Sequence, residues 1–226
     1  MPIAGKGMLL TSMDIDAAHE AEFNRWYDRE HLEKRVAIVG FLEARRYVAH
    51  DGKPKYLSLY STETIEVLGS PFYLTALANQ TAWSKANIAR FKDMIRGVSR
   101  ITISRGTGRG AALGIIRLRP VAGSEDKLRD ALRDQLDPSK LDGIISMHLL
   151  ENDPALSKPI TDDPKAPNPG AGDWFVLIDA TDVGAVLAAA TRVKDNAAFK
   201  PLVVSHGVYR LMWDLGRSDL PRAKIP

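Results

Sequence analysis

The stretch 23-FNRWYDREHLEKRVAIVGFLEARRY-47 decides the fold, because its pattern predicts an amphipathic helix, a glycine stop and a strand. On a helical wheel of about 100° per residue, Phe23, Trp26 and Tyr27 fall on one side together with His19. Such an aromatic side of a helix is expected to pack against a sheet.

Glu30 falls near the middle of this apolar side, and His31 lies roughly a quarter turn away at its edge. A carboxylate among aromatic rings is costly to bury unless it is hydrogen-bonded, paired or protonated. The pair therefore has two interpretations. Glu30 and His31 form a reactive acid and base, or Glu30 makes a salt bridge with a strand arginine while His31 caps carbonyls near the helix end.

Beyond Gly40 the predicted strand alternates between two faces. Arg45 and Tyr47 fall on one face, and Arg46 falls on the other. An acid, an imidazole and a guanidinium are thus placed near an aromatic surface. This is the densest cluster of candidate chemistry in the sequence.

Composition indicates an ordinary soluble globular protein. The chain has 226 residues, 45% hydrophobic and 26% charged residues, and a formal net charge of +3. The sequence contains no run of 18 apolar residues and no signal-peptide pattern, so we expect no membrane partner and a cytoplasmic location.

Several function classes are disfavoured by the same composition. The absence of cysteine excludes disulfides, thiolate metal sites and a cysteine nucleophile. Basic residues are interspersed with acidic ones, which argues against nucleic acid as a partner. The five histidines show no metal-ligand spacing, so we expect neither a metal nor another cofactor.

The predicted order of elements in the first half is β-α-β-β-α-β, which is a ferredoxin-like unit. The strands are expected at residues 7–15, 41–49, 55–61 and 98–104, and the helices at 17–36 and, broken near 79–80, at 72–91. The glycines at 106, 108 and 110 lead into another strand, so we interpret them as a linker and not as a phosphate-binding loop.

The second half repeats this order. Strands are expected at residues 111–118, 144–150, 173–180 and 207–213, and helices near 124–136 and 182–190. Gly143 occupies the position of Gly40, and this alignment places His148 where the first half has Arg45. No counterpart of the Glu30–His31 pair exists in the second half.

We therefore predict two ferredoxin-like domains, residues 1–106 and 107–226, the first carrying the WYxxEH motif. The second domain has a proline-rich insert at residues 152–172. An insert of that length suggests either a lid over a cavity or a surface arm that clasps another subunit.

The run quoted above resembles the pattern F-N-x-W-Y-x-x-E-H … G-F-x-x-x-R-R-Y of EthD-like proteins in the dimeric α+β-barrel superfamily. The resemblance implies an α+β fold in which two ferredoxin-like repeats pack their antiparallel sheets into a barrel with helices outside. Two subunits usually supply these repeats, and here one chain would form a pseudo-dimer.

The superfamily includes cofactor-free monooxygenases, isomerases, polyketide cyclases and haem-binding enzymes, so the resemblance implies a small-molecule cavity, present once per chain. Our leading hypothesis is cofactor-independent proton transfer on a small aromatic or apolar oxygenated metabolite. The alternatives are a non-catalytic small-molecule or stress-related binding protein and a haem-binding protein with a histidine ligand. Self-association through sheet packing stays open.

The candidate residues follow from the motif and the alternation. The expected catalytic residues are Glu30 as a general acid or base with a raised pKa, His31 as its proton partner and Arg45 as an oxyanion or carboxylate donor. The expected substrate-binding residues are Trp26, Tyr27, Arg46, Tyr47 and His148.

Overall fold

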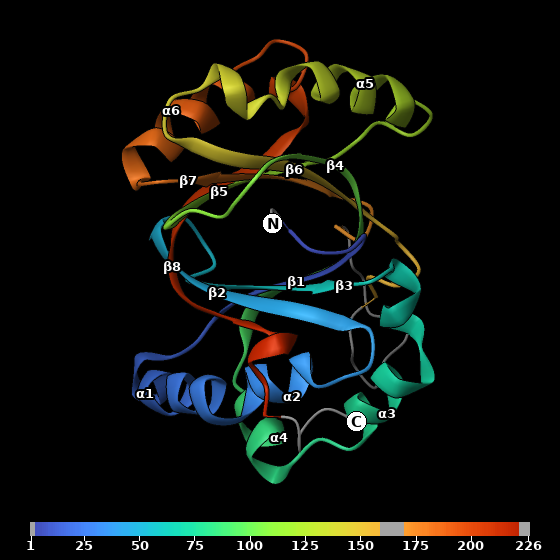
Figure 1. Cartoon of the computed structure of the whole chain (residues 1–226), viewed down its shortest axis with the longest axis vertical. Helices are drawn as coiled ribbons and strands as arrows, with labels where there is room; N and C mark the ends of the chain where they lie inside the picture. Colours follow the sequence, from blue (N-terminus) through green and yellow to red (C-terminus); the bar gives the residue numbers. More distant parts are fainter. Residues whose placement is uncertain (1–2, 159–169, 222–226) are drawn as a thin grey trace.

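Eight antiparallel strands close into one barrel, and helices cover it on two opposite sides (Figure 1). The structure is a computed structural model that describes residues 3–158 and 170–221. The strand order around the barrel is β1-β3-β2-β8-β5-β7-β6-β4. Closure leaves no free sheet edge, which removes the usual route to edge-to-edge aggregation.

The elements follow the predicted order in both halves. The first half contains β1 (Gly7–Asp14), α1 (Ala17–Trp26), η1 (Tyr27–His31), α2 (Leu32–Val36), β2 (Phe41–Asp51), β3 (Tyr56–Thr62), η2 (Ile65–Gly69), α3 (Pro71–Ala78), α4 (Ala82–Ile88) and β4 (Lys92–Gly106). The second half contains β5 (Ala112–Leu118), α5 (Glu125–Gln135), η3 (Pro138–Lys140), β6 (Ile144–Asn152), β7 (Trp174–Ala180), α6 (Val183–Lys194), η4 (Lys200–Leu202), β8 (Val203–Gly216) and η5 (Arg217–Asp219).

The two halves repeat each other in register. Phe41 of β2 lies opposite Thr62 of β3, and Ile144 of β6 lies opposite Ala180 of β7 in the same way. A bulge follows both of these pairs at the equivalent place. The halves are joined where β2 pairs with β8 and β4 pairs with β6. The predicted α+β fold, with two fused repeats forming one barrel, is confirmed.

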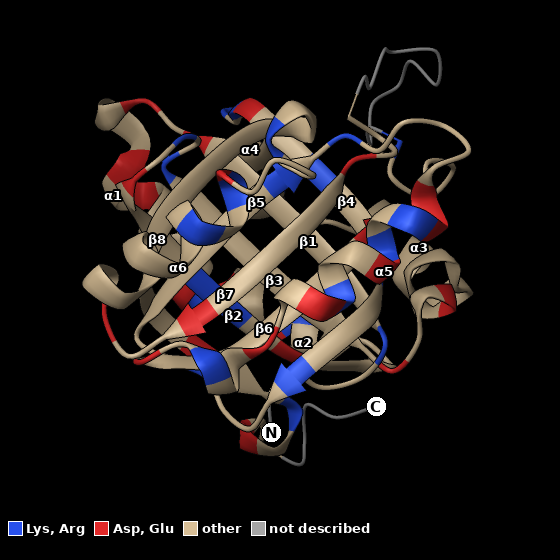
Figure 2. Cartoon of the chain, turned by 90° about the horizontal axis from the view of Figure 1, so that it is seen from above, with Lys and Arg blue, Asp and Glu red and all other residues tan. Residues whose placement is uncertain are grey.

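Three apolar clusters hold these layers together. One lies inside the barrel and includes Leu10, Leu59, Leu113 and Leu177. The second lies between the first-half sheet and its helices and is rich in aromatic rings, and the third lies under α5 and α6 and is mainly aliphatic. On the helix surfaces, basic and acidic residues are interspersed along the same helices (Figure 2), as in the ion pair between Arg133 and Asp130.

The predicted helix at 17–36 is present, but it contains a π-helical turn, η1. The Leu32 N–H donates to the Tyr27 carbonyl, five residues back instead of four. Because of this extra residue, the side chains that face the sheet occur one position later in the sequence than in a regular helix. The buried residues beyond Tyr27 are therefore His31, Leu32 and Val36, whereas a regular helix would turn Glu30 inward.

Residues 159–169 of the proline-rich insert, and thus the predicted lid or arm, lie outside the described residues. The described start of the insert is tied to β4, since the Arg96 Nη1 donates to the carbonyls of Leu156 and Lys158 at 2.6 and 3.1 Å. Among the helices of the described ranges, none combines the length and apolar character that a bilayer crossing requires.

The domain boundary predicted from the sequence is testable with a fragment of residues 1–106. In the whole chain, β2 and β4 pair with β8 and β6 of the other half, so the fragment leaves both strands as open edges. We expect it to self-associate or to remain unfolded, as measured by light scattering after gel filtration and by circular dichroism. A folded, monomeric fragment would contradict the interdependence of the halves.

Candidate functional site

Glu30 is held in a polar network outside the aromatic layer. Its Oε1 accepts hydrogen bonds from the hydroxyls of Thr81 at 2.6 Å and Ser84 at 2.9 Å, and its Oε2 pairs with Lys34 at 3.2 Å. Burial opposes ionisation, but these donors outweigh it and lower the pKa of Glu30. The predicted raised pKa is therefore wrong. The physical reason is that η1 turns the carboxylate toward the start of α4 instead of toward the sheet.

His31 takes the inward position instead. It is only 9% exposed, and its ring lies 4.2 Å from the Trp26 ring, 4.8 Å from the Tyr27 ring and 6.1 Å from the Tyr60 ring. Burial lowers the pKa of His31 well below its ordinary value, and the charges of Arg35 and Arg46 act in the same direction. His31 is thus a neutral imidazole, and neither ring nitrogen has a hydrogen bond to another described residue.

Arg46 and Tyr27 form the wall beside this imidazole. The Arg46 guanidinium lies 4.1 Å from the centre of the Tyr27 ring. Its terminal nitrogens donate to Asp28 at 3.1 Å and to Asn24 at 2.5 Å. The predicted neighbours Trp26, Tyr27, His31 and Arg46 are therefore brought together on the outer face of the first-half sheet.

Tyr60 of β3 completes this group and was not predicted. Its hydroxyl is buried without a hydrogen-bond partner in the described part of the chain. Burial raises the pKa of Tyr60 well above its usual value, and the nearby hydroxyls of Tyr27 and Ser58 influence that pKa although neither has hydrogen-bond geometry with it. Strand alternation places Tyr60 on the face opposite to Leu59, and this signal was available in the sequence.

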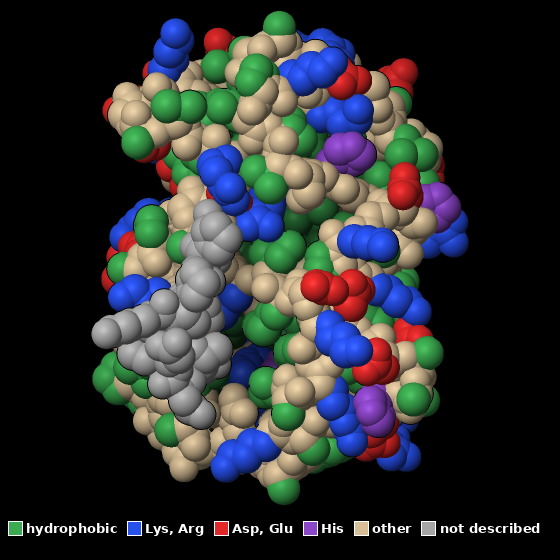
Figure 3. Space-filling view, turned by 180° about the vertical axis from the view of Figure 1, so that it is seen from behind, with side chains coloured by type: hydrophobic (Ala, Val, Ile, Leu, Met, Phe, Trp, Pro, Cys, Tyr) green, Lys and Arg blue, Asp and Glu red, His purple; other side chains and the backbone are tan. Residues whose placement is uncertain are grey.

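The surface is hollowed beside this layer. Seen from behind, the lower half of the molecule has a recess with basic and histidine side chains inside it and hydrophobic side chains around it (Figure 3). This lower half carries α1 to α4 (Figure 1). Concave surfaces of this kind are the usual binding places of small molecules.

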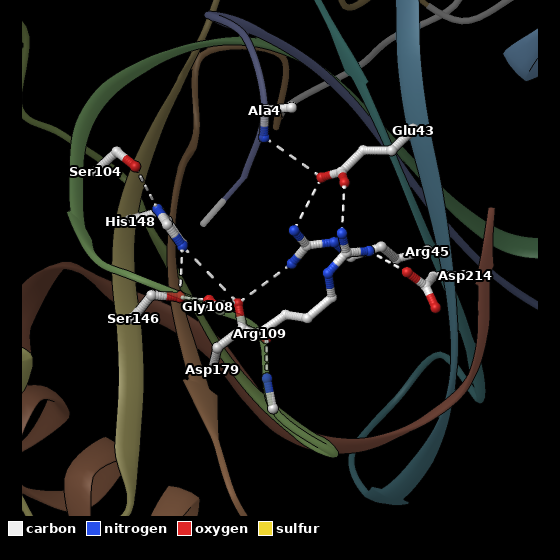
Figure 4. Close-up of polar contacts among 11 residues, drawn as sticks. Ala4, Glu43, Arg45, Ser104, Gly108, Arg109, Ser146, His148, Asp179 and Asp214 are labelled. Carbon is white, nitrogen blue, oxygen red and sulfur yellow. Dashed lines mark hydrogen bonds and ion pairs between the residues drawn. The ribbon is translucent and has the colours of Figure 1, made fainter. Parts of the chain in front are cut away.

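Arg45 and His148 lie elsewhere, inside the barrel, and a single carboxylate connects them (Figure 4). Asp179 Oδ2 is 3.5 Å from Arg45 Nη1 and 3.8 Å from His148 Nε2. All three side chains are at most 1% exposed. The alignment that matched His148 to Arg45 thus identified equivalent positions, but both face the interior and not the layer with His31.

Glu43 and serine hydroxyls complete the interior cluster. Glu43 Oε1 pairs with Arg45 Nη2 at 2.9 Å, and Glu43 Oε2 lies 3.3 Å from Arg109 Nη2. The His148 ring nitrogens contact the hydroxyls of Ser104 and Ser146, each at 3.0 Å. These groups come from both halves, so the cluster connects β2 with β6 and β7.

Tyr47, predicted to bind substrate, is also fully buried in the barrel interior. Burial and the nearby Asp179 carboxylate raise its pKa above the ordinary value for a tyrosine. Asp179 itself could have been found, because a lone acid in the strand WFVLIDA interrupts an apolar run. Arg45, Tyr47 and His148 are separated from His31 by the sheet, so the two groups cannot act on one small molecule.

The structural role of Glu30 predicts a stability effect. Replacing it by glutamine (Glu30→Gln) removes the charged acceptor of Thr81 and Ser84 and should lower the free energy of unfolding by about 1–2 kcal/mol. Urea unfolding measures this change. Glu63→Gln, at an exposed position, is the control and should change little. A fully stable Glu30→Gln variant would contradict the role.

The interior histidine predicts a pH effect. Burial and Arg45 lower the pKa of His148 to about 3, whereas an unfolded histidine takes up a proton below about pH 6.5. Stability is therefore lost as pH falls between these values, by at most about 1.4 kcal/mol per pH unit. His148→Gln should flatten this slope in urea unfolding between pH 7 and pH 4.5.

Asp179 has the opposite effect on the pH dependence of stability, in the wild type and in His148→Gln alike. Burial raises its pKa to about 6, so the folded chain takes up that proton first and gains stability as pH falls. Because Asp179 is present in the wild type and in the variant, the difference between their slopes reports His148. Equal slopes would show that His148 is not held neutral.

Comparison with known proteins identifies the fold. No family model matches the sequence, and the search of curated proteins finds no match. Solved structures do match. An anthrone oxidase-like protein superposes with a TM-score of 0.63 and 10% identity, covering 97% of each chain.

Two further structures extend the comparison. A protein from Lactobacillus acidophilus provisionally described as a monooxygenase has a TM-score of 0.54 and 11% identity, covering 95% of this chain and 97% of its own. A protein provisionally described as a chlorite dismutase has a TM-score of 0.56 and 11% identity, covering 93% and 96%. At these identities the likeness concerns the fold alone. The chain has the dimeric α+β-barrel fold, with both halves of the barrel supplied by one polypeptide.

Proposed function

We propose that this protein is an EthD-like cavity protein that binds a small aromatic or otherwise apolar oxygenated molecule between the first-half sheet and its helices. We further propose that it catalyses proton transfer next to a carbonyl without a cofactor. The observation that carries this is His31, a neutral and unpaired imidazole in an aromatic layer. The structural neighbours described as oxidases and monooxygenases support small-molecule chemistry in this fold.

His31 supplies the base in this proposal. A ring nitrogen takes a proton from the carbon next to the carbonyl, and the electron pair moves onto the carbonyl oxygen. The Tyr60 hydroxyl, which has no described partner, donates to that oxygen as its charge develops. Return of the proton to a second carbon completes an isomerisation, so atoms and charge balance.

The roles predicted for Glu30 and Arg45 change accordingly. Glu30 stabilises η1 and the start of α4. Arg45 supports the barrel interior. The aromatic wall of Trp26, Tyr27 and Tyr60 orients the apolar part of the ligand.

Hydrogen–deuterium exchange tests the activity. The probe is 2-tetralone, a bicyclic ketone with acidic protons beside its carbonyl. Proton NMR in heavy water measures how fast deuterium replaces these protons. The wild type should accelerate exchange, and His31→Gln should slow the catalysed rate by about 100-fold or more. His50→Gln, at an exposed position, is the control.

Different outcomes separate the hypotheses. Equal exchange rates for the wild type and His31→Gln would contradict catalysis by His31. Saturable binding of 2-tetralone without exchange would instead support the non-catalytic binding protein. Glu30→Gln should keep the exchange rate of the wild type once its lower stability is taken into account.

Haem ligation by His31, the other possibility raised by the sequence, fits the described surroundings less well. Three aromatic rings contact the imidazole and occupy sides on which a porphyrin would have to lie. Titration with hemin followed by absorbance tests this point. A sharp, stoichiometric Soret band that is lost in His31→Gln would favour haem over the proposed ligand.

A further inference from the structure

A row of polar side chains crosses the outer face of the first-half sheet. Arg46 of β2 lies opposite Ser58 of β3, Ser58 lies opposite Thr11 of β1, and Thr11 lies opposite Arg96 of β4. We call these four residues the polar row. Strand spacing of about 4.8 Å makes the row about 14 Å long.

Every member of the polar row has a buried polar atom without a hydrogen-bond partner among the described residues. These atoms are Arg46 Nε, Ser58 Oγ, Thr11 Oγ1 and Arg96 Nε. Arg46 is 0% exposed, Ser58 1% and Thr11 9%. An unpaired buried polar atom is costly, so four in one line indicate a site that a ligand or water completes.

The second half shows that the fold does not require this row. Leu149, Val176 and Ile116 occupy the equivalent positions on β6, β7 and β5, and all three are buried in the aliphatic cluster under α5 and α6. The fourth equivalent position is His206, which is exposed. The same face is therefore filled with apolar side chains where only packing is needed.

The charge around the polar row is positive. Arg46 pairs with Asp28, whereas neither Arg96 nor Arg35 has a carboxylate partner among the described residues. Arg35 lies 5.8 Å from the centre of the Tyr73 ring, and its charge acts on His31 and Tyr60. Partly buried cations without counterions favour a negatively charged ligand.

We propose, on the basis of the function proposed above, that the polar row binds the oxygen-bearing edge of an organic anion, a carboxylate or an enolate attached to an apolar ring system. The arginine Nε–H groups and the hydroxyls between them all donate to this edge. The apolar ring system of the ligand lies against Trp26 and Tyr27, beside the neutral ring of His31.

Matched probes test the charge of the ligand. The anion is 3-hydroxy-2-naphthoate, and the neutral analogue is its amide, 3-hydroxy-2-naphthamide. Both are titrated by fluorescence against the whole chain at low and at high salt. We expect the anion to bind at least about tenfold more tightly at low salt, and we expect this preference to shrink as salt screens the arginines.

Variants locate the binding. Arg96→Gln should weaken binding of the anion about tenfold and leave the amide within about twofold. Arg100→Gln, on the same face of the same strand but exposed and paired with Glu66, is the control for charge. Ser58→Ala should weaken both probes several-fold, whereas Ser61→Ala, equally buried but facing the barrel interior, should not.

The outcomes distinguish this inference from the function on which it rests. Equal affinity for the anion and the amide, with both sensitive to Ser58→Ala, would overturn the anionic ligand and leave the proposed site intact. Binding of neither probe, together with no exchange of 2-tetralone, would overturn both. If Arg96→Gln and Arg100→Gln weaken anion binding equally, the anion binds through general surface charge. This outcome would overturn the role of the polar row.

Discussion

The ion pair between Arg45 and Asp179 is the constraint that organises the barrel. Two charges from different halves are withdrawn from water, which is favourable only because each is also bonded to other groups. The equivalent of Asp179 in the first half is Ser61, and the equivalent of Arg45 in the second half is His148. Two identical subunits would lack this complementarity, so fusion of the halves permits an interior that neither half can build alone.

Fusion also permits the outer faces to diverge. The second half uses its outer face for aliphatic packing under α5 and α6. The first half covers the same positions with aromatic and polar side chains, several of which have no partner in the described chain. One half can therefore contain buried polar groups without hydrogen-bond partners in the described chain, while the other half and the shared interior maintain the fold.

Much of the fold follows from the sequence, because alternation, glycine stops and the repeated element order are local signals. The candidate site follows only in part. The aromatic motif correctly identified the helix that faces the first-half sheet. The sequence placed Glu30 inward and His31 at the edge, whereas the structure has the reverse. The helical wheel assumes a regular helix, and the π-helical turn η1 is not visible in composition or periodicity.

The residues that the sequence did not single out have a different origin. Ser58, Thr11 and Arg96 are unremarkable one by one, and they form a line only through pairing of strands that are far apart in the chain. Asp179 and Arg45 likewise meet only when the barrel closes. Such groupings depend on tertiary register, which no single segment encodes.

The wide turn at Tyr27–His31 also has an evolutionary consequence. This turn holds one residue more than a regular helical turn, and that residue determines whether an acid or an imidazole points at the sheet. Loss of one residue from this turn would exchange the two without altering either amino acid. Related chains with the same motif letters but a different spacing would then carry different chemistry at this site.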